Sequence, residues 1–347
     1  KKSPGKVPTS GKSAARGGSA LIVALWVIFI LTLLISSLAF EMKVEANVTA
    51  YYRKRVKAQY LAQAGVEWAK VLLTKKVKET EGELEIEEGE DEAMVLGAYN
   101  LSRGVGVSGI SKTLGEGEFH VDILPEEGRR NVNTLLEEDW QEILDQANVP
   151  TGMWDELMDC FYDWIDQGDE HRVNGAESDD AYYEDRGYKV KNAPLDTVDE
   201  LLLIKGFTPE ILYGGDSPDP KGAPLVGIAG WLTTWGDGRV NVNTASREVL
   251  LTLPGIEDWV VDDILEKRVG VDGAPGTKDD GFGSVDEVVS QTGLNAELKD
   301  RISTVDRKYL RIVSVGQVGE VRSGIWCILQ VTEGQVVPVF WREEPMD

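Results

Sequence analysis

The feature that most constrains this chain is an uninterrupted apolar run from Ser19 to Phe40. It reads SALIVALWVIFILTLLISSLAF, carries no charge, and has about the length that crosses a bilayer as a helix. The charged residues Glu41 and Lys43 follow immediately and mark the end of the apolar run, where the chain meets water again. The run therefore predicts one transmembrane helix at residues 19–40.

A short basic segment rich in Lys, Gly, Ser and Pro precedes the run and ends in Arg16-Gly17-Gly18. Such a segment followed by an apolar helix is typical of a cleavable leader. A conventional secretory signal is cut after its apolar part, and Ser37-Leu38-Ala39 offers small residues for that cut. A class III leader, cut after Gly18 so that Ser19 becomes the mature N-terminus, fits the run better. The basic residues then keep the N-terminus in the cytoplasm and direct the rest of the chain outward.

The helix is predicted to continue beyond the membrane. Apolar residues recur every four positions from Val44 to Leu72, and no proline interrupts residues 19–78. We expect one long helix over residues 19–78, apolar all round in its first half and amphipathic in its second. A signal anchor followed by a separate soluble helix is the alternative.

Strand and helix patterns divide the remaining chain. The acidic run at residues 79–92 predicts a solvated loop. Alternation predicts one strand at residues 118–124 and three more near the C-terminus, at 309–315, 325–331 and 336–341. The patterns between these groups are helical. We expect an α+β fold: a small antiparallel sheet from residues 79–129 and 307–347 packs on the long helix, and residues 130–306 form an inserted, mostly helical domain.

The inserted region contains a short internal sequence repeat, which we call the echo. Arg129-Arg130-Asn131-Val132-Asn133-Thr134 recurs as Arg239-Val240-Asn241-Val242-Asn243-Thr244, each time ahead of a predicted helix. The Asn and Thr oxygens suit the unpaired N–H groups at a helix start. The echo predicts a duplicated helical unit.

The second copy of the echo leads to Leu253-Pro254-Gly255-Ile256 and resembles a helix-hairpin-helix unit, whose backbone N–H groups cradle a DNA phosphate. Glu257 and Asp258 follow, where such a hairpin usually continues with Gly. The chain has 36 Lys plus Arg against 60 Asp plus Glu, a net charge of −24, with nearly all the excess acid after Glu79. This charge opposes phosphate binding, so we expect the unit to keep its fold without binding nucleic acid.

Two acidic loops are candidate calcium sites, because Ca²⁺ takes six to eight oxygen ligands from carboxylates, amides and backbone carbonyls. The denser loop runs from Asp163 to Tyr183 without EF-hand spacing, and the second runs from Asp272 to Gly281. The candidate ligands are Asp163, Asp166, Asp169, Glu170, Asn174, Glu177, Asp179, Asp180, Asp272, Asp279 and Asp280. On the residues alone, a solvated acidic loop remains the alternative for each.

Signals for catalysis are poor. His120 and His171 are the only histidines, which disfavours a His-rich zinc site, and no Gly-x-Ser-x-Gly elbow occurs. Residues 104–109 satisfy a Gly-x-Gly-x-x-Gly pattern outside a strand–helix context, so a flexible turn is expected there. No catalytic residue is predicted, and pairing of Cys160 with Cys327 is left open.

Together these features resemble the K-type minor pseudopilins of type II secretion systems. The resemblance is carried by the leader end at residues 16–18, the apolar helix, the stretch Gln59–Ala69, the Val240–Ala245 copy of the echo, and residues 163–183. It implies a pilin-like fold, calcium in the inserted domain, and cleavage before Ser19, with N-methylation there. It also implies an inner-membrane subunit with its body in the periplasm, at the tip of the pseudopilus, where it initiates assembly for export of folded proteins. The implied partners are the I- and J-type minor pseudopilins, other pseudopilins, the inner-membrane assembly platform and the prepilin peptidase.

One departure from ordinary pilins agrees with a tip position. Counting from Ser19, the fifth mature residue is Val23, where most pilins carry Glu. In the usual pilin arrangement that carboxylate pairs with the N-terminal amine of the subunit above, and an unpaired carboxylate in hydrocarbon is costly. A subunit with none above it has no such amine to neutralise.

Three alternatives remain. A minor type IV pilin would share the leader and the mode of assembly but does not need the large insertion. A membrane-anchored helix-hairpin-helix DNA-binding protein requires a basic hairpin face. A secreted, calcium-stabilised module requires cleavage after Ala39.

Overall fold

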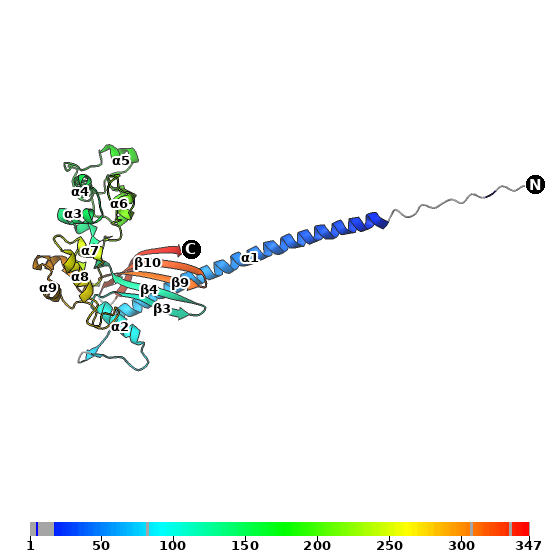
Figure 1. The fold of residues 1–347 in the computed structure, drawn as a ribbon, viewed down its shortest axis with the longest axis horizontal. Coiled ribbons are helices and arrows are strands. Elements are labelled where there is room, and N and C mark those ends of the chain that lie inside the picture. The colour runs from blue at the N-terminus through cyan, green and yellow to red at the C-terminus, as the bar shows by residue number, and fades with distance from the viewer. Residues whose placement is uncertain (1–4, 6–16, 81–82, 306–307, 333–334, 347) are drawn as a thin grey trace, which may run out of the picture. The chain divides into compact units, whose positions relative to one another are not determined.

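The computed structural model describes residues 5, 17–80, 83–305, 308–332 and 335–346, and the chain forms two compact units, residues 1–56 and 57–347 (Figure 1). Helix α1 (Gly17–Thr74) runs without interruption for 58 residues. In the described part of the chain, α1 alone is long and apolar enough to cross a membrane, and none of its apolar window is buried. The predicted long helix is therefore present, although it ends before Lys78. The Thr74 hydroxyl bonds to the Lys70 and Val71 carbonyl oxygens in its last turn.

The body is built on one five-stranded antiparallel sheet with the strand order β11-β10-β9-β4-β3. Its strands are β3 (Val107–Leu114), β4 (Gly117–Pro125), β9 (Tyr309–Val318), β10 (Val321–Thr332) and β11 (Gln335–Met346). All four predicted strands are found, each longer than predicted. Helix α2 (Glu92–Ser102) and β3 were not predicted, and the glycine pattern at 104–109 leads into β3 rather than forming only a turn.

The last turns of α1 pack closely on one face of this sheet. Ala62 and Ala69 are fully buried there, and the Ser314 hydroxyl donates to the Ala62 carbonyl oxygen at 2.8 Å. A Cβ at Gly316 would lie 1.9 Å from the Ala58 carbonyl oxygen, so only glycine allows this approach. The small side chains of the helix thus let its backbone touch the sheet.

The acidic run at 79–92, predicted as a loop, contains two short paired strands. Strands β1 (Glu79–Thr80) and β2 (Glu83–Leu84) pair antiparallel, with Glu79 opposite Leu84. Both short strands are largely exposed, in agreement with a solvated segment.

Between β4 and β9 the chain forms two successive helical units after the turn η1 (Glu126–Gly128). The first contains β5 (Arg130–Asn131), η2 (Val132–Thr134), α3 (Glu137–Gln146), η3 (Thr151–Met153), α4 (Trp154–Ile165), α5 (Ala181–Arg186), η4 (Val198–Leu203), α6 (Pro209–Tyr213) and β6 (Leu232–Thr233). The second contains β7 (Val240–Asn241), α7 (Arg247–Leu251), α8 (Asp258–Lys267), α9 (Val285–Thr292), η5 (Ala296–Arg301) and β8 (Ile302–Ser303). Within the region of helical pattern, residues 198–203 form the 3-10 helix η4 rather than an α-helix.

The two units are built alike, as the echo predicted. Each opens and closes with a two-residue parallel strand pair, β5 with β6 and β7 with β8. The Asn133 amide exchanges two hydrogen bonds with the Leu195 backbone, at 3.0 and 2.7 Å. The Asn243 amide does the same with the Phe282 backbone, at 3.1 and 2.8 Å. Similar sequences follow these positions, Thr197-Val-Asp-Glu and Ser284-Val-Asp-Glu, and form a second echo that was not predicted.

The predicted capping role of the echo was wrong in one respect. Asn131 accepts from the Asn133 N–H at 3.0 Å and so caps the turn η2 rather than an α-helix. Helix α7 is capped by Ser246 instead. At the start of α3, the Asp139 carboxylate accepts from the Leu136 N–H at 2.9 Å. The echo marks the entry to each unit, but not the helix caps.

The body has two buried apolar clusters. One joins α1 to the sheet, and the other fills the helical units around Trp140 and Phe161, whose rings meet edge to face at 4.9 Å. Cys160 belongs to the helical cluster and Cys327 to the sheet cluster, and both are free and buried.

Candidate metal centre

The first acidic loop, which joins α4 to α5, is held to α4 by two carboxylates one helical turn apart. Asp159 accepts from the Asn174 backbone N–H and side-chain amide, both at 3.0 Å. Asp163 is fully buried and accepts from the Arg172 N–H with both oxygens at 3.2 Å. A Cβ at Gly175 would lie 1.8 Å from one Asp163 oxygen, so the loop needs glycine at this point.

Glu177 is the most unusual group in this loop. Its side chain is 2% exposed, and neither carboxylate oxygen has a hydrogen-bond partner. Burial raises the pKa of Glu177, and the nearby charges of Asp163, Asp166 and Asp169 raise it further. Burial likewise raises the pKa of Asp163, although the Arg172 N–H opposes the shift. Four carboxyl groups therefore repel one another here, and two of them are removed from water.

The other predicted residues of this loop have separate roles or face solvent. Asp180 caps α5 through the Tyr182 N–H and pairs with Lys205 at 3.0 Å, and these contacts keep its pKa low. Asp179 pairs with His171 at 2.9 Å. Asp166, Asp169 and Glu170 are exposed, and so is Asn174. The structure thus separates Asp179 and Asp180 from the buried pair Asp163 and Glu177.

The second acidic loop joins α8 to α9 and is stabilised by hydrogen bonds between its own residues. Asp279 accepts from the Val271 N–H at 2.6 Å and from the Thr277 hydroxyl at 2.8 Å, and these bonds lower its pKa. Asp280 accepts from the Gly276 N–H at 2.5 Å, and Asp272 from the Ala274 N–H at 2.8 Å. Because their carboxylates have partners within the loop, these three residues do not form a group that needs a cation.

The two loops occupy equivalent places in the two helical units. The Trp164 carbonyl, at the end of α4, accepts from Asn192, and the Arg268 carbonyl, after α8, accepts from Gly281. The sequences Val173-Asn-Gly-Ala and Val271-Asp-Gly-Ala also correspond. Of the two loops, only the first buries a carboxylate without a hydrogen-bond partner, Glu177, so it is the one whose donor set fits a hard divalent cation. In the described part of the chain, no three acidic, His or Cys side chains converge as a preformed metal-binding group.

The helix-hairpin-helix segment does not offer a phosphate site. The Glu142 carboxylate accepts from the Gly255 N–H, while burial raises its pKa overall. Arg247 is paired with Asp258 and Asp262 on α8. The hairpin amide and the nearby cation therefore both face carboxylates of the same chain.

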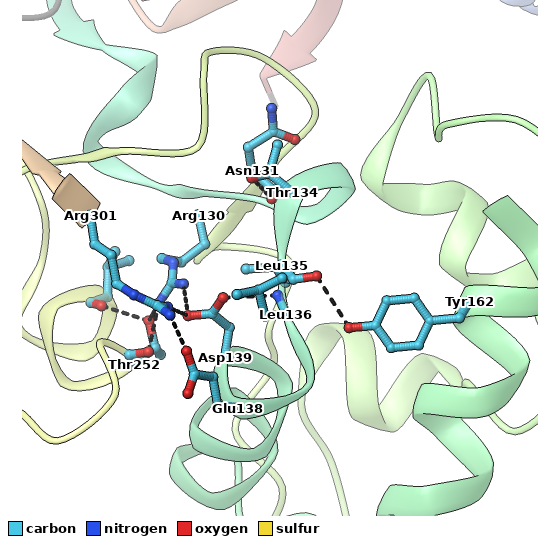
Figure 2. Close-up of polar contacts among 11 residues, drawn as sticks. Arg130, Asn131, Thr134, Leu135, Leu136, Glu138, Asp139, Tyr162, Thr252 and Arg301 are labelled. Carbon is cyan, nitrogen blue, oxygen red and sulfur yellow. Dashed lines mark hydrogen bonds and ion pairs between the residues drawn. The ribbon is translucent and has the colours of Figure 1, made fainter. Parts of the chain in front are cut away.

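A buried ionic cluster that was not predicted from the sequence joins the two helical units (Figure 2). Arg130 is 3% exposed and bonds both to Asp139 on α3 and to the Thr252 carbonyl oxygen, the latter at 2.6 Å. Arg301, from η5, donates to the same Asp139 at 2.8 Å and pairs with Glu138. One departure from the echo is the only signal for this cluster, since Arg130 stands where the second unit has Val240.

The residues proposed for processing lie at the start of α1. Gly18 and Ser19 fall in its first turn, whereas the basic leader ahead of Gly17, except Gly5, lies outside the described residues. Val23 is 62% exposed on the apolar part of the helix. This surface suits lipid or other helices.

Comparison with known proteins agrees with this fold. The family described as "Type II secretion system (T2SS), protein K" matches residues 117–213, which cover β4 to α6. No curated protein matches. A chain in the crystal structure of the GspK-GspI-GspJ complex from the enterotoxigenic Escherichia coli Type 2 Secretion System has the same fold. The TM-score is 0.53 at 15% sequence identity, over 88% of this chain and 100% of that chain. The family match over residues 117–213 and the shared fold together support a minor pseudopilin of the K type.

Proposed function

We propose that this minor pseudopilin occupies the tip of the pseudopilus and initiates its assembly for the export of folded proteins across the outer membrane. The observation that carries the proposal is Val23, an apolar residue at the fifth position after the proposed cleavage site. A subunit without a carboxylate there cannot neutralise the amine of a subunit above it. It is therefore suited to be the last subunit of the filament.

The partners proposed for the tip are the I- and J-type minor pseudopilins. Support comes from the similar solved chain, which belongs to a complex of GspK with GspI and GspJ. Other pseudopilins, the inner-membrane assembly platform and the prepilin peptidase would be met during assembly and processing. The role of such a subunit is structural, and no reaction is assigned to it.

We further propose that the first acidic loop binds Ca²⁺. Asp163 and Glu177 would be the central ligands. Asp166 and Asp169 lie close enough for their charges to act on Glu177, so they would add to the negative charge around the cation. A divalent cation would neutralise buried carboxylates that otherwise repel one another. The second loop is a weaker candidate, because backbone and hydroxyl donors already satisfy Asp272, Asp279 and Asp280.

The location proposed is the inner membrane, with α1 as a single span and the body in the periplasm. The first test is the N-terminal residue and mass of the protein purified from its native membrane. A chain that begins at Ser19 supports prepilin processing. A start at Phe40 indicates a secreted module, and an uncut leader indicates a simple membrane anchor; either result overturns the tip proposal.

Two other functions receive less support. A minor type IV pilin would share the processing but not the K-family match at residues 117–213. A DNA-binding role would need free hairpin amides and unpaired basic residues, and here Glu142, Asp258 and Asp262 face those groups.

A further inference from the structure

A cavity of about 360 Å³ lies between the sheet and the first helical unit. Its floor is the face of β10 and β11 opposite α1, because Trp326, Ile328 and Phe340 alternate with the residues that pack on the helix. Its other wall comes from the start of η4 and from residues 229–235, next to β6. Cavities of this size at the junction of two substructures are the usual places for ligands.

The apolar part of the cavity is aromatic. Trp326 and Phe340 meet edge to face with ring centroids 4.5 Å apart, and both are only partly buried. Trp235 lines the same cavity, and its ring packs against that of Tyr309 with the ring centroids 5.3 Å apart. Such walls suit a flat or compact apolar side chain more than a long alkyl chain.

The charged groups of the cavity leave one cation without a close partner. Among the described residues, the Arg129 guanidinium makes no hydrogen bond, and its ion-pair partner, Glu126, is 3.8 Å away. Glu126 is 2% exposed and is shared with Arg311, also at 3.8 Å. Burial and the Arg311 charge lower the pKa of Arg129 to about 10, so this guanidinium is both desolvated and poorly compensated.

The carboxylates on the cavity rim are already engaged. Asp196 pairs with Lys191 at 2.7 Å, and Glu344 with Arg342 at 2.9 Å. Asp199 accepts from the Tyr213 hydroxyl at 2.9 Å. Arg129 is therefore a desolvated cation with free hydrogen-bonding capacity, and its planar fork matches a carboxylate.

We propose that this cavity binds the free C-terminus of a partner polypeptide that ends in an aromatic or compact apolar residue. The terminal carboxylate bonds to Arg129, and the last side chain lies against Trp326 and Phe340. Thr233 and Thr234 also line the cavity. The Thr233 hydroxyl accepts from the Trp235 N–H at 3.2 Å and can still donate, and the Thr234 hydroxyl donates to the Asp196 carbonyl oxygen at 3.0 Å and can still accept, so they suit the peptide groups before the last residue. These polar walls favour a polypeptide end over a fatty acid, which carries no peptide groups.

The test uses the full chain in nanodiscs and a hexapeptide, Gly-Ser-Gly-Ser-Ala-Phe, labelled with fluorescein at its N-terminus. Fluorescence anisotropy compares the peptide acid with its C-terminal amide. We expect the acid to bind at least about tenfold more tightly, because the amide loses the charge-assisted hydrogen bonds to Arg129. This comparison needs no variant and so does not depend on how a substitution folds.

Variants then locate the site. Arg129→Gln should remove the preference for the acid, and Trp326→Leu should weaken both peptides. Arg322→Gln is the matched control, since Arg322 is exposed on β10 outside the cavity and bonds to Gln317. Equal binding of acid and amide, absence of binding, displacement by a fatty acid but not by unlabelled peptide, or a preference that survives Arg129→Gln would each overturn the proposal.

Discussion

Carboxylates of one loop differ in their chemistry because their neighbours differ. Asp180 has a backbone N–H and Lys205 beside it, and its pKa is lowered. Glu177, three residues earlier, is buried beside other carboxylates, and these raise its pKa although the Ser178 N–H opposes the shift. The sequence places both in one acidic stretch, whereas their burial and partners depend on how the loop folds against α4.

The raised pKa of Glu177 predicts a link between pH, calcium and stability. Since its folded-state pKa exceeds the unfolded value, the stability contributed by this carboxyl is fully present below the unfolded pKa. That contribution is lost as the pH rises through the folded pKa. Metal-free protein should therefore lose stability as the carboxyl ionises, and Ca²⁺ should restore it at neutral pH.

Glu177→Gln should raise the stability of the metal-free protein at pH 7 by about 1–3 kcal/mol, because it removes a buried, unpaired charge. The same change should reduce the gain in melting temperature on adding Ca²⁺. Thermal melts in chelator and in CaCl₂ measure both effects. Asp179→Asn, at an exposed residue paired with His171, is the control and should change neither. A variant that gains as much from Ca²⁺ as the parent would remove Glu177 from the site.

At the scale of elements, the sequence predicted the strands and helical units whose residue patterns recur along the chain. Strands β4, β9, β10 and β11 show clear alternation, and the paired echoes mark the two helical units. Strand β3 lacks a buried face and contains Ser, Gly, Lys and Thr, so periodicity does not reveal it. Residues 197–204 have helical spacing, and periodicity does not distinguish the 3-10 helix that residues 198–203 form from an α-helix.

The ionic cluster between the units could not be predicted, because Asp139 and Arg301 are 162 positions apart. Asp139 accepts from two arginines and from the Leu136 N–H, so it joins α3, β5 and η5. Asp139→Asn should destabilise the body by about 3–5 kcal/mol, since it leaves Arg130 buried without a counter-charge. Urea denaturation followed by circular dichroism measures the change. Glu138→Gln, beside it but more exposed, should cost no more than about 1 kcal/mol. Equal effects of the two substitutions would contradict a special role for the buried pair.

At the scale of the whole molecule, charge and hydropathy divide the chain by environment. The apolar part of α1 carries no ionised group from Ser19 to Phe40, the residues just beyond it are rich in Lys and Arg, and the acidic excess lies after Glu79. These divisions were readable from the sequence, because the length of an apolar run and the balance of charge do not depend on packing. Which residues close the cavity or surround Glu177 depends on contacts between distant segments.

The proposed tip position makes a prediction about Val23. Val23→Glu should impair assembly, because a carboxylate within the membrane costs about 2.5–3.5 kcal/mol and a tip subunit has no amine above to neutralise it. The measurement is the amount of exported protein, with co-purification of the I- and J-type pseudopilins, in cells that lack the native copy. Val23→Leu keeps the position apolar and should behave like the parent, and membrane levels of each variant must match. If Val23→Glu assembled and secreted normally at equal membrane levels, the apolar fifth residue would carry no information about position. If only the Glu variant failed, the absence of a carboxylate would be a requirement of the subunit that ends the filament.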